Sequence, residues 1–247
     1  MTSPARVNRP VVDLLRAPDG PRDRQLLYGE TVEILSRNEA WAAVRADKDG
    51  YTGHIEASAL DTPLDATHWV SAPATHAYAD ADFKSRDLCA LSFGSRVQVR
   101  SDTDRFAETE LGHIPMTHLS PIGTLPADPV TVAEGFLGTP YLWGGNSRFG
   151  IDCSGLVQVA LLVCGIPCPG DSGPQERELG RLLPTGSSYE RGDLLFWKGH
   201  VALVRDPDSI IHANVHHMAV AIEPLDAAIK RIAAQGDGPV TAHKRLG

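Results

Sequence analysis

Long hydrophobic runs are missing from this chain of 247 residues, and no apolar stretch approaches the ~20 residues that a membrane-spanning helix needs. Residues 1–10 contain neither an apolar core nor a small-residue cleavage site, so we expect no secretory signal and a cytoplasmic protein. Excess positive charge is missing too. The formal net charge of −8 argues against nucleic acid and membrane surfaces as partners. With 42% hydrophobic residues, the composition is that of a soluble globular protein.

Cysteine is scarce, with four residues, and free thiols are the default expectation for a chain without an export signal. Cys164 and Cys168 are separated by three residues and have no nearby ligand partners, which is a poor spacing for zinc. We interpret both as small buried hydrophobic residues at a helix end. The sequence therefore predicts neither a structural zinc site nor any other cofactor.

The first half contains an internal repeat of short alternating segments. Three pairs of segments match: residues 28–34 with 93–99, 41–44 with 106–109, and 53–55 with 112–114. The first copy is longer at residues 46–51, a polar turn where a hairpin loop tolerates insertions. About five short strands in ~60 residues predict a small barrel. The order aromatic-Gly-x-x-Val, a second aromatic residue and Gly-x-Ile resembles bacterial SH3 domains, which we place at 8–62 and 66–121.

Proline and glycine block regular structure in residues 122–129, which we interpret as a linker. Asp128 suits the N-cap of a helix with Pro129 at its first position, and Gly138 suits the end of that helix. The rest of the chain, residues 130–247, then forms a separate domain.

A buried helix followed by strands is expected in this last domain. Apolar residues cover much of a helix at 153–164, which is typical of a buried helix. The other elements are expected as follows: a short helix near 176–183, strands at 193–197, 200–204, 210–213 and 218–222, a helix near 226–234, and a last strand from residue 240. A helix packed on an antiparallel sheet is an α+β domain.

Cys153 opens the buried helix after a glycine-rich loop at 144–150. Exposed N–H groups and the dipole at a helix start favour the thiolate, and a nearby imidazole favours it further. The alternative is a buried structural cysteine, which fits poorly with flanking Asp152 and Ser154. The chemistry indicated is that of a thiol hydrolase.

His200 and His212 are expected side by side on neighbouring antiparallel strands. In a thiol hydrolase His200 would take and return the proton, and His212 would hold the His200 ring by a hydrogen bond. The alternative is a pair of packed or surface histidines. A metal site built from His212, His216 and His217 is also conceivable, but no acidic residue has the spacing of a zinc peptidase.

The second half of the chain contains four specific motifs: Pro-Tyr-Leu-Trp-Gly-Gly at 140–145, Asp-Cys-Ser-Gly-Leu-Val at 152–157, Arg-Gly-Asp-Leu-Leu-Phe at 191–196 and Gly-His-Val-Ala at 199–202. Residues 126–245 resemble the NlpC/p60 family of papain-like cysteine peptidases. The fold implied is two small all-β bacterial SH3-like barrels followed by an α+β papain-like domain. The paired SH3 domains resemble those of a subgroup that recycles murein peptides.

The resemblance implies hydrolysis of the bond between γ-D-glutamate and a diamino acid, diaminopimelate or lysine, in free murein peptides with N-terminal L-alanine. It implies that Cys153 is the nucleophile, His200 the base and His212 the orienting residue. Tyr141 matches a tyrosine that faces the active site, where its hydroxyl could help the Cys153 N–H to stabilise an oxyanion. The alternative for Tyr141 is a core aromatic with a hydrated tip.

Asp152 and Ser154 match residues that contact the amino-terminal end of the substrate, although Asp152 could also cap the helix. Asp171 and Ser172 resemble an Asp-Ser pair that the subgroup uses for the same amine. The alternative is a capping box formed by Ser172 and Gln175.

The subgroup closes one end of its groove with an acidic residue and a tyrosine from the first SH3 domain. Glu30 and Tyr51 are the candidates here, and the alternative for Glu30 is a solvated turn residue. Two other functions stay open: an exported hydrolase that acts on intact wall, and a catalytically inactive wall-peptide binding module. Intact Cys153, His200 and His212 argue against the inactive module.

Overall fold

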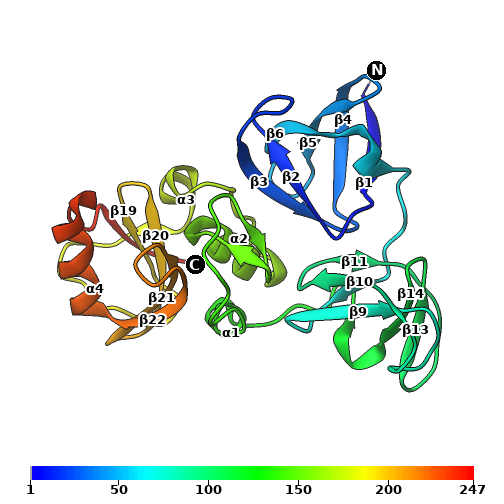
Figure 1. The fold of residues 1–247 in the computed structure, drawn as a ribbon. Helices are drawn as coiled ribbons and strands as arrows, with labels where there is room; N and C mark the ends of the chain where they lie inside the picture. Colours follow the sequence, from blue (N-terminus) through cyan, green and yellow to red (C-terminus); the bar gives the residue numbers. More distant parts are fainter. Residues whose placement is uncertain (1) are drawn as a thin grey trace. The chain divides into compact units, whose positions relative to one another are not determined.

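The computed structural model describes residues 2–247 (Figure 1). It divides into two compact units. The first contains residues 2–124 together with Asn146–Phe149, and the second contains Leu125–Gly145 and Gly150–Gly247. No helix within the described range combines the length and the apolar character that crossing a membrane would require.

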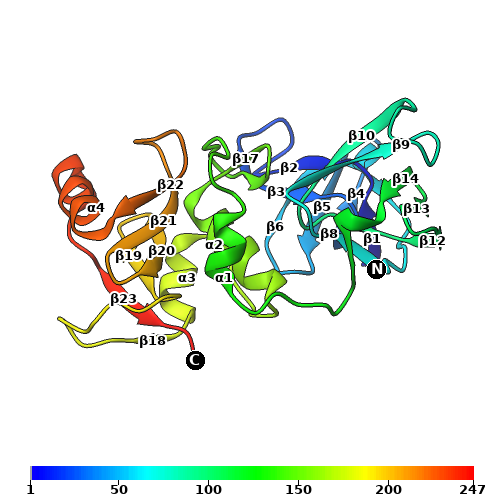
Figure 2. The same ribbon diagram turned by 90° about the horizontal axis from the view of Figure 1, so that it is seen from below.

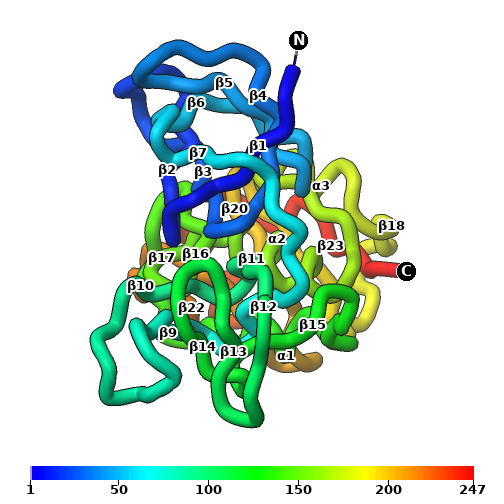
Figure 3. The backbone as a smooth tube through the Cα atoms, turned by 90° about the vertical axis from the view of Figure 1, so that its right-hand side faces the viewer, coloured from blue at the N-terminus to red at the C-terminus, as the bar shows by residue number. Residues whose placement is uncertain are grey.

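The first unit begins with a seven-stranded antiparallel sheet in the order β3-β2-β6-β5-β4-β1-β7, whose chain path can be followed in Figure 3. The strands are β1 (Ser3–Val7), β2 (Val11–Leu15), β3 (Arg22–Leu27), β4 (Thr31–Arg37), β5 (Trp41–Ala46), β6 (Thr52–Glu56) and β7 (Leu60–Asp61), with a 3-10 turn at Ala57–Ala59. The short strands expected in the repeat segments 28–34, 41–44 and 53–55 are present as β4, β5 and β6. Strand β1 precedes the predicted start at residue 8 and pairs with both β4 and β7.

Two further sheets follow in the same unit, in the orders β10-β9-β14-β13-β12 and β11-β8-β15. The strands are β8 (His68–Val70), β9 (Ala74–Tyr78), β10 (Asp87–Ser92), β11 (Arg96–Val97), β12 (Val99–Asp102), β13 (Phe106–Thr109), β14 (Gly112–Pro115) and β15 (Leu119–Pro121), with a 3-10 turn at Met116–His118. The sequence repeat has a structural counterpart. Gly29 and Gly94 both have positive φ, and their N–H groups donate to Val7 and Val70 at 3.0 and 2.9 Å.

Tyr28 links the two copies of the repeat. Its side chain is buried in the apolar cluster of the second copy. Its hydroxyl donates to Glu110 at 2.9 Å and accepts from Arg6 at 3.1 Å, while the N–H of Arg96 donates to the Tyr28 carbonyl at 2.8 Å. A buried aromatic ring with a satisfied hydroxyl is a stable anchor, so the copies pack as one unit.

The second unit combines helices with a six-stranded antiparallel sheet in the order β18-β23-β19-β20-β21-β22. Its helices are α1 (Pro129–Glu134), α2 (Cys153–Val163), α3 (Ser172–Glu178) and α4 (Leu225–Ile232), the last followed by a π-helical turn at Ala233–Asp237. The strands of the sheet are β18 (Arg181–Leu182), β19 (Leu194–Trp197), β20 (His200–Asp206), β21 (Ser209–Asn214), β22 (Ala219–Pro224) and β23 (Ala242–Arg245). Strand β17 (Gly150–Ile151) precedes α2, whereas β16 (Asn146–Ser147) belongs to the first unit.

The core of this unit explains why these segments adopt these structures. Helix α4 lies beside the sheet (Figure 2). The apolar side chains of Leu225, Ala228 and Ile232 pack against β19, β20 and β21. These three residues lie at helical spacing, and the rest of α4 is mostly polar and solvent-facing. Helix α2 is apolar on most sides and contacts β20 and β21. The expected α+β arrangement is therefore present.

Two predicted helix bounds are wrong. The first helix ends at its C-cap, Gly135, and the chain then turns until Gly138, whose φ is +75°. Helix α3 begins at Ser172 and not near residue 176, and it ends because Leu179 is extended. The expected N-cap of α1 is confirmed, because the Asp128 carboxylate accepts from the N–H groups of Val130 and Thr131 at 3.0 and 3.3 Å.

Candidate active site

Asp152 fixes the glycine loop to the start of α2. Its Oδ2 accepts from the Gly144 N–H at 2.9 Å, and its Oδ1 accepts from the Gly155 N–H at 2.6 Å and the Ser154 hydroxyl at 3.2 Å. Asp152 is the N-cap residue of α2, so the predicted capping role is confirmed. The carboxylate thereby joins the glycine loop before Cys153 to the first turn of α2 after it, and Cys153 is the first residue of that helix.

Cys153 is 7% exposed and lies where first-turn N–H groups of a helix are directed outward. Such a position stabilises negative charge on sulfur. Burial raises the pKa of the Cys89 and Cys164 thiols. Cys164 is the C-cap of α2 and is only partly buried, so the prediction of a buried residue is wrong for it, whereas Cys168 is buried as predicted.

Tyr141 lies close to this cysteine. Burial raises the pKa of Tyr141, and the charges of Cys153 and Asp152 raise it further. Its backbone forms a bridge with Ile151, just before the start of α2. The hydroxyl therefore stays protonated at neutral pH and is available as a hydrogen-bond donor.

His200 and His212 lie on adjacent strands, β20 and β21, and their rings are in contact. His200 Nε2 and His212 Nδ1 are 2.8 Å apart, which is a hydrogen bond. His212 is fully buried, whereas His200 is partly exposed. The predicted side-by-side arrangement of the two histidines is confirmed.

Burial lowers the pKa of His200 to about 3, and the charges of His212 and Arg231 act in the same direction. The pKa of His212 is lowered by burial as well, although Glu223 opposes that shift. Both rings are therefore neutral at pH 7. A neutral His200 can accept a proton, which a general base must do.

Glu223 and Arg231 extend this pair and were missed by the sequence analysis. Glu223 Oε2 lies 2.6 Å from His212 Nε2, and Arg231 donates to both Glu223 oxygens at 3.0 and 2.5 Å. Burial alone would raise the pKa of Glu223, but hydrogen bonds from His212 and Arg231 lower it to about 2. The sequence signal that could have found Glu223 is an acidic residue eleven positions after His212, on the next strand of the sheet.

Gln175 connects α3 to the first turn of α2. Its amide Nε2 donates to the carbonyls of Ser154 and Pro169, both at 2.9 Å, and its side chain is fully buried. The capping-box interpretation of Ser172 and Gln175 is wrong, because the N-cap of α3 is Asp171 and the Gln175 amide turns inward. Asp171 and Ser172 thus begin a helix that is tied to the Cys153 helix.

Tyr51 and Glu30 lie in the first unit. The Glu30 carboxylate accepts from Lys48 at 2.8 and 2.9 Å and from the Leu27 N–H at 3.0 Å. Tyr51 packs against the apolar cluster of the first sheet. Both therefore have interactions within the first sheet, and their role in a groove stays a prediction.

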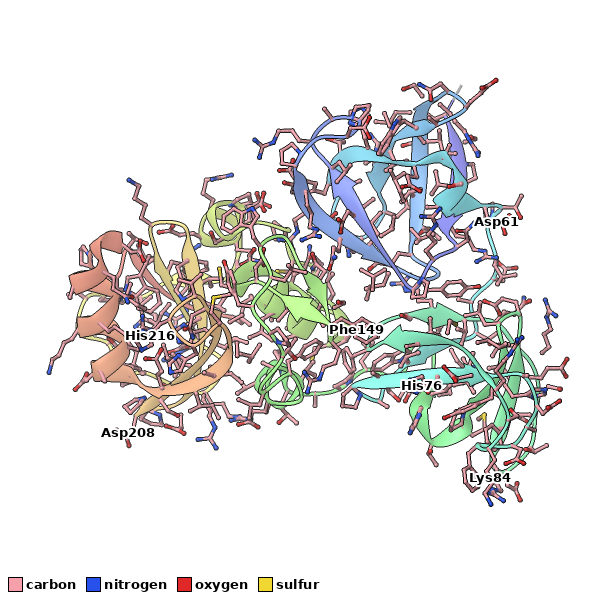
Figure 4. The ribbon with its side chains drawn as sticks, viewed as in Figure 1. Asp61, His76, Lys84, Phe149, Asp208 and His216 are labelled. Atoms are coloured by element: carbon pink, nitrogen blue, oxygen red, sulfur yellow. The ribbon has the colours of Figure 1, made fainter. Side chains whose placement is uncertain are left out.

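The rings of His216 and His217 in the β21–β22 turn are in edge contact, with their centroids 4.8 Å apart. His216 lies in that turn (Figure 4), and His217 bonds to Asn214 Oδ1 through its own Nδ1 at 3.0 Å. Within residues 2–247, no group of three or more His, Cys, Asp or Glu side chains is arranged to hold a metal ion.

The site residues thus fall into two groups within the second unit. Tyr141, Asp152 and Cys153 lie at the start of α2, while His200 and His212 lie on the sheet. The two groups would act together in one reaction step, the transfer of the Cys153 thiol proton to the His200 imidazole.

Comparison with known proteins gives two family matches. Residues 138–233 match the NlpC/P60 family, and residues 14–60 match the bacterial dipeptidyl-peptidase SH3 domain. The γ-D-glutamyl-L-lysine dipeptidyl-peptidase of Bacillus subtilis (strain 168) is 28% identical over 83% of this chain and 76% of its own length. Dipeptidyl-peptidase 6 of Lysinibacillus sphaericus is also 28% identical, over 82% of this chain and 83% of its own.

A solved structure shares the fold. The crystal structure of an NlpC/P60 family protein from Bacillus cereus ATCC 10987 superposes with a TM-score of 0.81 and 22% identity, and the match covers 99% of both chains. The similarity extends over the N-terminal sheets as well as the domain that contains Cys153.

Proposed function

We propose that this protein is a cysteine peptidase. It carries an NlpC/P60 domain that follows a bacterial dipeptidyl-peptidase SH3 domain. Its substrates are free murein peptides, and it cleaves the bond between γ-D-glutamate and the following diamino acid. The relatives from Bacillus subtilis and Lysinibacillus sphaericus, named as dipeptidyl-peptidases, support this substrate class. The proposal includes a cytoplasmic location and a second SH3-type barrel at residues 66–121.

One observation carries the catalytic part of the proposal. A neutral His200 is hydrogen-bonded to a fully buried His212 in a domain whose first buried helix begins at Cys153. A base with an orienting partner, together with a cysteine at a helix start, is the arrangement that activates a thiol.

Acylation begins when His200 removes the proton from the Cys153 thiol and the sulfur attacks the γ-carbonyl carbon of D-glutamate. The carbonyl oxygen becomes an oxyanion. The Cys153 N–H and the protonated Tyr141 hydroxyl are the donors that would stabilise it. Collapse of the tetrahedral intermediate breaks the C–N bond, and the amine of the diamino acid leaves with the proton from His200.

Deacylation returns the enzyme to its starting state. His200 removes a proton from water, the hydroxide attacks the thioester carbonyl, and Cys153 leaves as the thiolate. That thiolate recovers its proton from His200. The products are L-Ala-γ-D-Glu and a peptide or amino acid that begins with the diamino acid.

Recognition of the free amino end of the substrate is assigned to two segments. Asp152 and Ser154 begin α2, and Asp171 and Ser172 begin α3, which Gln175 ties to the same turn. A carboxylate is the natural partner of a protonated amine. Glu30 and Tyr51 are proposed to close the groove, which would admit short peptides and exclude cross-linked wall.

The test compares two substrates. The protein is incubated with the free peptide L-Ala-γ-D-Glu-diaminopimelate and, separately, with intact sacculi, and the products are identified by mass. We expect L-Ala-D-Glu from the free peptide alone. An N-acetylated peptide serves as the control for the amino end and should be cleaved poorly.

Other results of this test would favour a different function or mechanism. Release of wall fragments from sacculi would favour an exported peptidoglycan hydrolase. Binding without turnover of either substrate would favour an inactive wall-peptide module. Activity that resists iodoacetamide but is lost with a chelator would rule out the thiol mechanism.

A further inference from the structure

We propose that Glu223, held by Arg231, is a positioning residue that decides which nitrogen of His200 is free to accept a proton. This inference rests on the proposed role of His200 as the general base. Nothing in the family resemblance or in the names of the relatives assigns a role to Glu223 or Arg231.

The four side chains form one hydrogen-bonded series. His200 Nε2 and His212 Nδ1 are 2.8 Å apart, His212 Nε2 and Glu223 Oε2 are 2.6 Å apart, and Arg231 binds both oxygens of Glu223. His212 pairs with Ala221 across the β21–β22 ladder, so Glu223 is its diagonal neighbour on the same face. Arg231 comes from α4, the helix that packs on this sheet.

The direction of each hydrogen bond follows from the ends of the series. An ionised carboxylate only accepts, so His212 must carry its proton on Nε2. Because His212 is neutral, its Nδ1 is then an acceptor, and His200 must donate from Nε2. The neutral His200 ring has one proton, so its Nδ1 holds the free lone pair. The structure thus assigns Nδ1 of His200 as the basic atom.

Without an acceptor at position 223, the opposite arrangement becomes accessible. His212 could carry its proton on Nδ1 and donate to His200 Nε2, which would leave the His200 proton on Nδ1. That ring could not take a proton from the thiol with the same atom. In a serine triad, loss of the correct tautomer lowers kcat by about 10⁴-fold.

Other groups near the series are few among the described residues. His217 Nδ1 lies 3.9 Å from Glu223 Oε2, and the Trp197 ring centroid lies 5.7 Å from that of His200. Arg231 places its positive charge in direct contact with the carboxylate and keeps Glu223 ionised. The Glu223 carboxylate is therefore a hydrogen-bond acceptor for His212 throughout the neutral pH range.

A matched set of side chains exists elsewhere in the same unit. Asp193 is 1% exposed, accepts from Arg245 at 2.7 and 2.8 Å, and lies 2.7 Å from His243 Nε2. It has the same chemistry as the Glu223 set, a buried carboxylate between an arginine and a histidine, but it is not bonded to His200 or His212. It therefore controls for the structural cost of removing such a pair.

The first test reads the protonation of each ring nitrogen directly. Full-length protein labelled with ¹⁵N-histidine is examined by long-range ¹⁵N–¹H correlation NMR near pH 7, with assignments from single histidine variants. We expect protonated Nε2 and unprotonated Nδ1 in both His200 and His212. A proton on His212 Nδ1 in the wild-type protein would overturn the proposal. This measurement does not depend on peptidase activity, so it can succeed even where the proposed function fails.

The second test removes the acceptor together with its cation, in the double variant Glu223→Leu/Arg231→Met. Replacing a buried ion pair by apolar residues of similar size is often tolerated, whereas removing one partner is costly. We expect kcat to fall about 10²-fold while KM stays within about twofold, because Glu223 does not touch the substrate. The His212 proton should move to Nδ1 in part of the population.

The control is Asp193→Leu/Arg245→Met, which should leave kcat and both tautomers unchanged at a temperature where it is folded. A Glu223→Leu/Arg231→Met protein with wild-type kcat and wild-type tautomers would also overturn the proposal. If that variant does not fold, the wild-type spectrum alone decides.

Discussion

A single sulfur atom carries the proposed chemistry, and its surroundings set Cys153 apart from the other three thiols. Cys153 begins a helix and lies beside a tyrosine hydroxyl and a capping carboxylate. Cys89 and Cys164 have raised pKa values because of burial, and Cys168 Sγ donates to a carbonyl at 3.5 Å. A thiol becomes a nucleophile through its thiolate, so the position of Cys153 at a helix start bears directly on its reactivity.

Cys153→Ala should abolish turnover of L-Ala-γ-D-Glu-diaminopimelate and preserve its binding, because the change removes one atom and leaves the cap and the histidines in place. Product release is followed by mass spectrometry and binding by calorimetry. Cys164→Ala, at the far end of the same helix, is the matched control and should keep both properties. Unchanged turnover in Cys153→Ala would remove the thiol mechanism.

Tyr141→Phe tests the second oxyanion donor. The hydroxyl is protonated at neutral pH, so its loss should lower kcat by about 10²-fold, the usual effect of removing one such donor. The ring stays, so the thermal midpoint should change little. Tyr189→Phe is the control, because Tyr189 packs on the apolar cluster beside α4. A Tyr141→Phe protein with kcat within about twofold of wild type would assign the residue to packing instead.

The helices and strands that have a clear local sequence pattern could be predicted from the sequence. The hairpin β19–β20 follows from two apolar runs around a Lys-Gly turn, and its register pairs Trp197 with His200. Helix α2 follows from its apolar content and its glycine loop. His200 and His212 could be placed together because neighbouring antiparallel strands bring such residues into contact.

The elements that depend on long-range contacts were not predictable. Glu223 ends a strand and Arg231 lies in the following helix, and only the packing of α4 onto the sheet brings the guanidinium to the carboxylate. Gln175 misled the interpretation of α3 for a related reason. Its spacing from Ser172 suits a capping box, but the amide turns inward and its Nε2 donates to the carbonyls of Ser154 and Pro169.

The start of α2 has no room for an additional carbon at position 155. A Cβ on Gly155 would lie 2.4 Å from the Gly145 carbonyl oxygen and 3.0 Å from Asp152 Oδ1. Gly155→Ala should therefore push the helix away from the glycine loop and lower the free energy of unfolding by about 1–3 kcal/mol. Because the Asp152 cap would be displaced, kcat should fall as well. Urea unfolding and peptide turnover measure the two effects.

Gly173→Ala provides the comparison within α3. There the nearest atom to a new Cβ is the flexible Arg177 Nη1 at 3.5 Å, which is an ordinary contact. Alanine favours a helix over glycine by up to about 1 kcal/mol, so this variant should be as stable as wild type or more so. Equal losses in both variants would show that the crowding at Gly155 is not the cause.

Over the whole molecule, the groups with shifted pKa values are distributed unevenly between the two units. In the second unit, burial lowers the pKa of His200 to about 3 and also lowers that of His212. In the first unit, Asp13 is the carboxylate to compare. Burial opposes its ionisation, but hydrogen bonds from Arg22 and Gln25 bring its pKa below the ordinary value of 3.8. The two units should therefore respond to acid at different pH values.

Whether stability rises or falls with pH depends on whether the folded or the unfolded state binds the proton more tightly. An unfolded histidine binds a proton below its ordinary pKa of 6.5, whereas burial in the folded second unit lowers the pKa of His200 to about 3 and also lowers that of His212. The stability contributed by the two neutral rings is thus complete above pH 6.5 and falls as the pH is lowered towards the folded pKa. Each histidine contributes a slope of at most about 1.4 kcal/mol per pH unit. Asp13 begins to lose its contribution only below pH 3.8.

Hydrogen exchange followed by mass spectrometry between pH 6.5 and 4.5 resolves the two units, once rates are corrected for intrinsic exchange. Protection of β20 and β21 amides should fall by up to about tenfold per pH unit for each histidine, while protection of β4 and β5 should stay nearly constant. The variant His200→Gln/His212→Gln should flatten the slope in the second unit, since it removes both titrating rings. A parallel loss of protection in both units, or an unchanged slope in that variant, would show that other groups control the acid response.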